Sequence, residues 1–98
     1  MKGFMYILLC SDNSYYVGST IDIDKRLNEH QTGRGANYTK TRLPVILLYY
    51  EMFQNIGDAF YREKQVKGWS RKKKEALINN QQNKLPNLSI AYRDKNES

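Results

Sequence analysis

The sequence contains one cysteine, one histidine and no long apolar run, and each shortage excludes a class of protein. Cys10 alone cannot form an internal disulfide. Because Asp12 directly follows the short apolar start, we expect no signal peptide and a reducing, cytoplasmic compartment. One cysteine and one histidine also fall short of a zinc ligand set. Without about 18 consecutive apolar residues we expect no membrane span, and hence no membrane partner.

Length and composition indicate one small domain with a basic character. A chain of 98 residues, 40% hydrophobic and 12% aromatic, is long enough for one modest core. We expect the domain to span residues 1–82, and the polar residues 83–98 to form a flexible C-terminal tail. The net charge of +6 fits a polyanionic partner, although charge alone does not identify one.

The alternation of apolar runs and turn-forming residues predicts an α+β fold, a three-stranded antiparallel sheet flanked by helices. The first two strands form a hairpin around a Ser-Asp-Asn-Ser turn. The third strand is rich in β-branched and aromatic residues, so we expect it to be the central or most buried one. A Gly-rich basic loop at 33–44, with room for one helical turn, precedes it. The order is strand, strand, helix, strand, helix, helix, with strands at 4–10, 15–17 and 45–53, and helices from a cap within 19–22 to about 31, at 58–67 and at 71–81.

Glu63 stands where an apolar residue belongs on the second predicted helix. It shares a stripe with Ala59, Phe60 and Val66, which predicts that its side chain points towards the sheet. An ionised carboxylate left half buried without a partner is strongly unfavourable, so Glu63 needs a cation. That cation is either Arg26 or a lysine in a salt bridge, or a metal ion. Helix geometry alone favours the salt bridge.

Two tyrosines, one arginine and the single histidine are further candidates. Tyr6 and Tyr16 lie on neighbouring strands, where paired tyrosines usually serve cross-strand packing. A phenol has a pKa of about 10 and acts as a base only where cations lower that value, a role open to Arg26. Arg26 is also suited to holding a phosphate oxygen. His30 follows Arg26 by four positions, which places both at the rim of the core, yet a lone helical histidine is more often a surface or packing residue.

The remaining basic residues, interleaved with aromatic ones, are candidates for contacts with nucleic acid. Such a mixture suits phosphate binding together with base stacking. A solvated surface without a partner explains the same residues equally well. The candidates are Arg34, Tyr38, Lys40, Arg42, Lys64, Lys67, Arg71, Lys72, Lys73 and Lys74.

The same residues resemble the motifs of the GIY-YIG nuclease superfamily. Met5-Tyr6-Ile7 is similar to a degenerate first motif that lacks the glycine, and Tyr16-Val17-Gly18 is similar to the second. The order of the superfamily's functional residues is also present: Tyr16 follows Tyr6 by ten positions, Arg26 follows Tyr16 by ten, His30 follows Arg26 by four, and Glu63 follows Tyr16 by 47.

The resemblance spans about residues 4–78, which is most of the chain. A Gly-Ala-Asn-Tyr-Thr-Lys stretch at 35–40 makes it strongest to the small stand-alone bacterial branch of the superfamily. Active members often carry an asparagine in the helix well after the glutamate. Asn79 and Asn80 are both candidates for that position, and the sequence does not choose between them.

The resemblance implies a metal-dependent endonuclease acting on DNA. Glu63 would bind one Mg²⁺ or Mn²⁺, so the metal replaces the salt bridge as the preferred interpretation. Tyr16 would act as the general base or orient the attacking water, and Tyr6 would position that base or a phosphate oxygen. Arg26 would neutralise charge on the pentavalent phosphorus, and His30 would assist proton transfer or grip phosphate.

Three functions are therefore carried forward. The preferred one is hydrolysis of DNA phosphodiesters in repair or recombination, with RNA as an alternative substrate. We expect it to be directed by structure rather than by sequence, because so small a domain has few contacts for reading bases. The second is a non-catalytic nucleic-acid-binding module on the same scaffold. The third is an adaptor that recruits a protein partner. The oligomeric state is left open.

Overall fold

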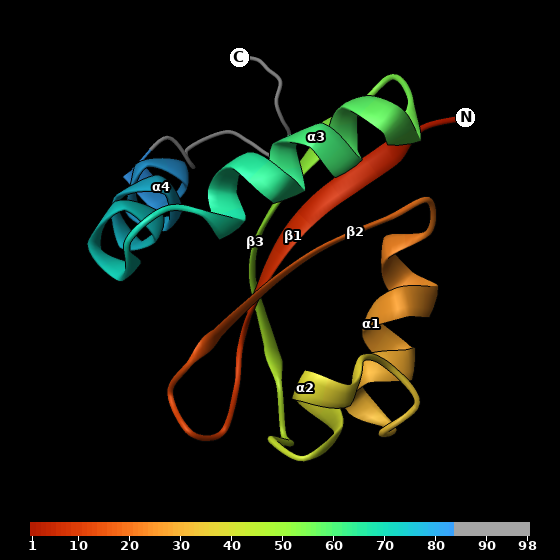
Figure 1. Ribbon diagram of the computed structural model, residues 1–98, viewed down its shortest axis with the longest axis vertical. Coiled ribbons are helices and arrows are strands. Elements are labelled where there is room, and N and C mark those ends of the chain that lie inside the picture. Colours follow the sequence, from red (N-terminus) through yellow and green to blue (C-terminus); the bar gives the residue numbers. More distant parts are fainter. Residues whose placement is uncertain (84–98) are drawn as a thin grey trace.

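The computed structural model describes residues 1–83, which form a three-stranded antiparallel sheet with helices on both faces (Figure 1). The predicted α+β class and order of elements are confirmed. Asn83, placed in the expected tail, ends the last helix, and the rest of that tail lies outside the described residues. The elements are β1 (Gly3–Leu9), β2 (Tyr15–Thr20), α1 (Ile23–Gln31), α2 (Asn37–Lys40), β3 (Ile46–Phe53), α3 (Ile56–Lys67) and α4 (Arg71–Asn83).

β1 is the central strand, and it separates two layers of core. It pairs with β2 on one side and with β3 on the other. Met5 and Ile7 pack with side chains from α3 and α4, whereas Tyr6, Leu8 and Cys10 pack with side chains from α1 and the segment before β3. Because both faces of β1 are covered, its sequence is a continuous apolar run. Cys10 is buried, as its apolar surroundings predict.

The prediction that the strand at 45–53 is the central or most buried one is wrong. β3 lies at an edge of the sheet, and Ile46 and Met52 are 55% and 49% exposed. Tyr49 is buried on the face covered by α3 and α4, but the opposite face of β3 is largely open. The apolar content of a strand reports its side chains, not which neighbours it pairs with, so composition could not separate β3 from β1.

The three longer helices begin at side-chain caps. Asp22 accepts a hydrogen bond from the backbone N–H of Lys25 at the start of α1, within the predicted cap segment 19–22, and Ser70 accepts one from Lys73 at the start of α4. Asn55 caps α3, so that helix begins two residues earlier than the predicted Asp58. None of the helices within residues 1–83 has the length and apolar content needed to cross a bilayer.

One residue assigned to the buried stripe of α3 lies outside it. Ala59, Glu63 and Val66 are buried, but Phe60 is 50% exposed. Successive helical positions differ by about 100° in direction, so the residue after Ala59 turns away from the sheet. The stripe is therefore narrower than predicted, and Glu63 lies at its middle.

Candidate active site

Glu63 lies against the sheet, as the helical spacing predicts. The residue is 8% exposed. Its Oε1 accepts a hydrogen bond from Ser19 Oγ at 2.5 Å, and its Oε2 accepts one from Lys67 Nζ at 2.8 Å. Ser19 belongs to β2 and Lys67 follows Glu63 by one helical turn. The carboxylate is therefore held where α3 packs against β2.

Lys67, and not Arg26, is the cation paired with Glu63 in this structure. The two side chains differ in exposure: that of Glu63 is 11% exposed and that of Lys67 is 53% exposed. The hydrogen bond to Glu63 raises the pKa of Lys67 above its usual value. The ammonium is half exposed on a flexible stem, so another cation can reach the carboxylate and take its place. The predicted salt bridge between Glu63 and a lysine is present, and another cation can replace that lysine.

His30 is fully buried, which corrects its predicted position at the rim of the core. Its Nε2 lies 2.8 Å from Tyr6 Oη, and its Nδ1 lies 2.8 Å from Thr39 Oγ1. The Thr39 hydroxyl also donates its only proton to the carbonyl of Ala36 at 3.1 Å. It must therefore accept from Nδ1–H, which leaves Nε2 to accept from the Tyr6 phenol. The burial arises because the short helix α2 folds back onto α1.

Burial shifts both members of this pair in the direction that keeps them neutral. It lowers the pKa of His30 to about 4, and the nearby charge of Arg26 lowers it further. Burial also raises the pKa of Tyr6 to about 12, although Arg26 acts in the opposite direction. The Glu63 carboxylate lies near enough to contribute to the rise. At neutral pH the Tyr6 phenol thus keeps its proton and donates it to His30.

Two glycines make room for this buried pair. A Cβ on Gly18 would lie 2.6 Å from Cζ of Tyr6 and 3.1 Å from Cε2 of Tyr16. A Cβ on Gly35 would lie 2.9 Å from the His30 Cα. Real Cβ atoms essentially never lie within 3.0 Å of another heavy atom, so a side chain at either position would displace Tyr6 or His30.

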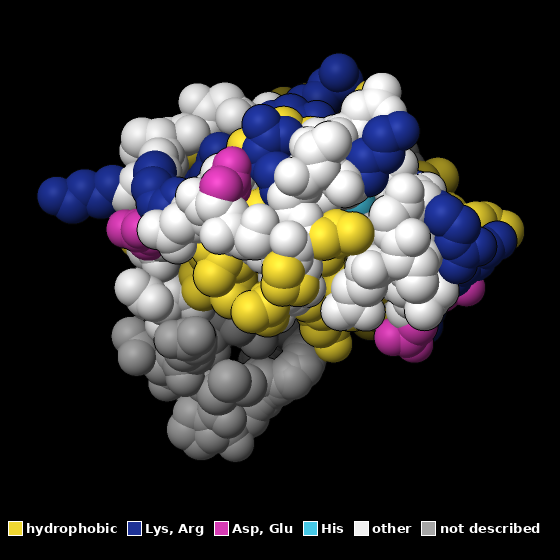
Figure 2. Space-filling model, turned by 90° about the horizontal axis from the view of Figure 1, so that it is seen from below, with side chains coloured by type: hydrophobic (Ala, Val, Ile, Leu, Met, Phe, Trp, Pro, Cys, Tyr) yellow, Lys and Arg dark blue, Asp and Glu magenta, His cyan; other side chains and the backbone are white. Residues whose placement is uncertain are grey.

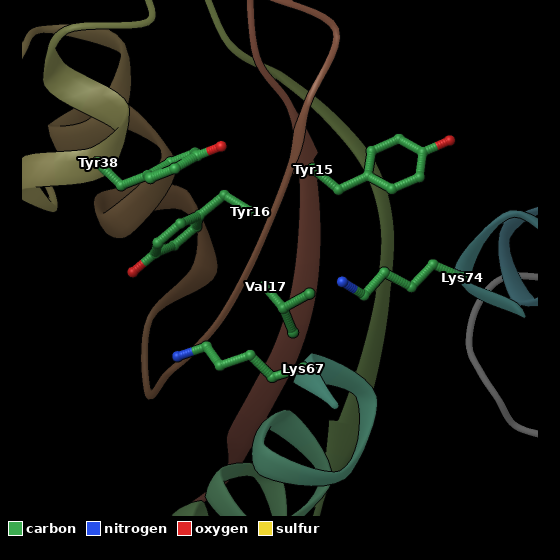
Figure 3. Close-up of a pocket in the computed structure, with 6 residues that line it drawn as sticks. All are labelled: Tyr15, Tyr16, Val17, Tyr38, Lys67 and Lys74. Atoms are coloured by element: carbon green, nitrogen blue, oxygen red, sulfur yellow. The ribbon is translucent and has the colours of Figure 1, made fainter. Parts of the chain in front are cut away.

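Tyr16 joins the buried pair to the surface. Its ring centroid lies 5.2 Å from that of His30, 6.4 Å from that of Tyr6 and 6.1 Å from that of Tyr38. Tyr16 is half-buried and lines a surface pocket together with Lys67 (Figure 3). Of the two predicted tyrosines, Tyr16 is therefore the one whose side chain faces open space.

Arg26 is half-buried beside Tyr6, close enough to lower the pKa of that phenol. Its Nη1 donates to Glu29 Oε1 at 3.0 Å, across an ion pair within α1. The structure thus brings Tyr6, Tyr16, Arg26 and His30 together around β1, β2 and α1. Glu63 forms no hydrogen bond or ion pair with these four side chains, but its charge lies near enough to act on the pKa of Tyr6, and its partner Lys67 lines the pocket with Tyr16.

The basic candidates divide into two sets. The first set lines the pocket beside Tyr16 or lies over a tyrosine that lines it: Tyr38, Arg42, Lys67, Arg71 and Lys74. Seen from the side of the β1–β2 turn and α2, basic side chains are spread around the surface beside a patch of exposed hydrophobic ones (Figure 2). The other candidates lie apart from the pocket: Arg34 bonds Thr32 and Asn28, Lys64 lies over Phe60, Lys73 lies over Trp69, and Lys40 and Lys72 are exposed.

Sequence reasoning missed Ser19 and Thr39. Strand alternation offered a signal for Ser19, which lies two residues after the buried Val17 and so on the face that meets α3. Thr39 carried no such signal, because its role depends on the fold-back of α2. The asparagine candidates, Asn79 and Asn80, are both exposed on α4, a helix that packs against β3.

A metal ion at this site would depend on one carboxylate. Within residues 1–83 no three side chains of the types His, Cys, Asp and Glu converge on one point. Glu63, with the Ser19 hydroxyl beside it, is the oxygen donor that the site offers. This set fits Mg²⁺ or Mn²⁺, since Mg²⁺ keeps several waters and is commonly held by one or two carboxylates together with substrate phosphates.

Comparison with known proteins identifies the family of this chain. Residues 2–76 match the model of the GIY-YIG catalytic domain. A UPF0213 protein from Staphylococcus haemolyticus is 46% identical over 77 residues, which cover 79% of this chain and 94% of that protein. The solution structure of a UPF0213 protein from Bacillus halodurans is similar with a TM-score of 0.54 and 41% identity, covering 82% of this chain and 85% of that one. The solution structure of a protein from E. faecalis is similar with a TM-score of 0.58 and 32% identity, covering 95% of this chain and 96% of that one. The chain therefore belongs to the GIY-YIG nuclease superfamily.

Proposed function

We propose that this protein is a metal-dependent endonuclease that hydrolyses phosphodiester bonds in DNA, and that Glu63 binds its single Mg²⁺ or Mn²⁺. The observation that carries the proposal is the state of the Glu63 carboxylate. It is buried, and within residues 1–83 its hydrogen-bond partners are two side chains, one of them an exposed lysine. A buried carboxylate needs a cation, and an exposed lysine is a partner that a divalent ion can reach and replace.

Glu63 would hold the divalent cation, which when bound would supply polarisation of the scissile phosphate and stabilisation of the leaving oxygen. Hydrolysis forms a bond between the water oxygen and phosphorus, breaks one P–O ester bond, and leaves a proton on the departing oxygen. Tyr16 is the phenol that faces open space, so it holds the attacking water and takes part in its deprotonation. Arg26 neutralises charge on the phosphoryl oxygens.

Tyr6 and His30 hold this arrangement in place rather than exchange protons with solvent. Tyr6 is tied to His30 as a hydrogen-bond donor, and its pKa of about 12 keeps it protonated. His30, with a pKa of about 4, stays neutral at neutral pH. The rings of Tyr6 and His30 pack against the ring of Tyr16 and so fix the Tyr16 phenol in its position towards the substrate.

Cleavage assays with matched variants test the proposal. Branched, flapped and single-stranded DNA would be incubated with the protein in Mg²⁺ or Mn²⁺. Glu63→Gln keeps the size of the side chain and removes its charge, and Tyr16→Phe removes only the hydroxyl. We expect both to lose at least about 100-fold in rate, Tyr16→Phe by loss of an acid–base contribution and Glu63→Gln by loss of the metal ligand. Asp24→Asn, which alters an exposed carboxylate on α1, is the control and should cleave like the wild type.

Cleavage that continues unchanged in Glu63→Gln would exclude the proposed chemistry. A second candidate function, binding without cleavage, is favoured by the cations and tyrosines around the pocket beside Tyr16. It predicts salt-sensitive DNA binding that is indifferent both to metal and to Glu63→Gln. The domain is small, so in either case we expect contacts with backbone and shape rather than with sequence.

A further inference from the structure

A pocket of about 260 Å³ opens next to the Glu63 site, along the free edge of β2 (Figure 3). Within the described part of the chain, β2 pairs with β1 alone, so its other edge faces this pocket. Four elements contribute to the walls, and the side chain of Lys67 is shared with the Glu63 site. The lining residues are Tyr15, Tyr16, Val17, Tyr38, Lys67 and Lys74.

The charge of the pocket selects for an anion. Lys67 and Lys74 reach it from two different helices, and none of the residues that line it is acidic. Among residues 1–83, no carboxylate pairs with Lys74. Two more cations lie over the tyrosine rings: the guanidinium of Arg42 is 3.8 Å from the centroid of Tyr38, and that of Arg71 is 4.0 Å from that of Tyr15.

The aromatic walls are held in place before any ligand binds. Tyr38 is stacked on Tyr16 with an angle of 24° between the ring planes, and its hydroxyl donates to Ser14 Oγ at 2.8 Å. Tyr15 forms the opposite side, with Val17 between them and the Lys74 ammonium pointing towards Val17 (Figure 3). The Tyr38 ring is covered by Arg42 and stacked on Tyr16, so a flat base would stack on it by displacing the Arg42 guanidinium, with the ammonium groups beside it for the attached phosphates.

We propose that this pocket binds one unpaired nucleobase of the substrate strand, with Lys67 and Lys74 contacting the phosphates on its two sides. The inference rests on the proposed function and names its substrate class: a strand with an unpaired nucleotide beside the bond that is cut. A base inside a duplex is stacked and paired, and would have to leave the helix at a cost in free energy to enter the pocket. Single strands and flaps are therefore the preferred substrates.

Binding without metal tests the pocket separately from cleavage. Fluorescence anisotropy in EDTA would compare a short deoxythymidine strand, a strand of the same length and charge made of abasic sugars, and a duplex of that length. Stacking of one base predicts that the abasic strand binds about 5- to 150-fold more weakly than the deoxythymidine strand. The duplex should also bind more weakly, despite its greater charge.

Three tyrosine variants and two lysine variants locate the effect. Tyr38→Ala should remove the preference for bases over abasic sugars, Tyr38→Phe should retain it, and Tyr61→Ala, at a tyrosine 72% exposed on α3, should leave it unchanged. Lys74→Gln should weaken binding of the single strand more than Lys72→Gln, on the same helix but outside the pocket. The lysine pair remains informative if Tyr38→Ala fails to fold.

Equal binding of the abasic and deoxythymidine strands, or equal effects of the two lysine variants, would overturn the inference. Tighter binding of the duplex would do the same. These outcomes are independent of the nuclease proposal, because no metal is present and no bond is cut. A protein that prefers unpaired bases but never cleaves would retain this pocket and lose only the catalytic assignment.

Discussion

Tyr6 and His30 meet in a 2.8 Å hydrogen bond between the central strand and α1, with the phenol as donor. The direction of the bond follows from Thr39, whose hydroxyl gives its proton to a backbone carbonyl and so accepts from the other ring nitrogen. A proton committed in this way is not available to a substrate. The hydrogen bond separates the roles of Tyr6 and Tyr16, since of these two tyrosines it is Tyr16 that lines the pocket.

Removing the Thr39 hydroxyl should lower the free energy of unfolding. Thr39→Val keeps the shape of the side chain but leaves Nδ1–H of the buried His30 without an acceptor. An unsatisfied buried group costs about 1–3 kcal/mol, so the free energy of unfolding should fall by that amount. Thr39→Ser restores the oxygen and should recover most of the loss. Denaturant unfolding gives the free energies, and ¹⁵N shifts of the imidazole report whether Nδ1 keeps its proton.

Stability should decline in mild acid because of His30. Its pKa of about 4 in the folded protein lies below the usual 6.5, so the unfolded chain takes up the proton first as the pH falls. The contribution is complete above about pH 6.5 and is lost between there and pH 4, to a total of roughly 3 kcal/mol. His30→Gln should flatten this part of the profile. A wild type and variant with the same slope from pH 7 to pH 4.5 would contradict the burial of a neutral imidazole.

Local sequence patterns predict much of the fold, whereas the prediction that was wrong depends on which strands pair with each other. The hairpin, the Ser70 cap and the helical turn inside 33–44 each depend on a few adjacent residues. The assignment of the third strand as central depended on which strands are neighbours. Two strands of similar apolar content, one central and one at an edge, differ only in tertiary contacts.

The site divides in the same way. Spacing along single elements placed Glu63 on the buried face of α3 and Tyr6 next to Tyr16. Spacing could not show that Lys67 would be the partner of Glu63, because Arg26 and several lysines were equally compatible with one helix. Nor could it show the burial of His30, which α2 produces by folding over α1 after a glycine-rich turn.

Removing the Lys67 ammonium should strengthen metal binding at Glu63. The ammonium occupies Oε2 of the carboxylate, so a divalent cation has to displace it. Lys67→Met keeps most of the apolar stem, and the loss of an ion pair worth about 1 kcal/mol, the upper end for pairs with exposed groups, predicts an affinity for Mn²⁺ about fivefold higher. Calorimetry or NMR titration without DNA measures it. Lys64→Met, on the exposed face of α3, is the control, and an equal gain there would point to net charge instead.

The glycine of the second motif should resist even the smallest side chain. Gly18→Ala would place a methyl group 2.6 Å from Cζ of Tyr6, where the buried ring cannot turn aside without breaking its bond to His30. Overpacking of this kind costs about 1–3 kcal/mol, and we expect the His30 pKa to rise as the pocket around it opens. Gly68→Ala is the matched control. The nearest atom there lies 3.6 Å away and φ is −82°, so alanine fits and should be neutral or stabilising by up to about 1 kcal/mol. Thermal unfolding and histidine NMR titration of both variants measure the difference, and a Gly18→Ala protein as stable as Gly68→Ala, with an unshifted His30, would show that the phenol does not need this space.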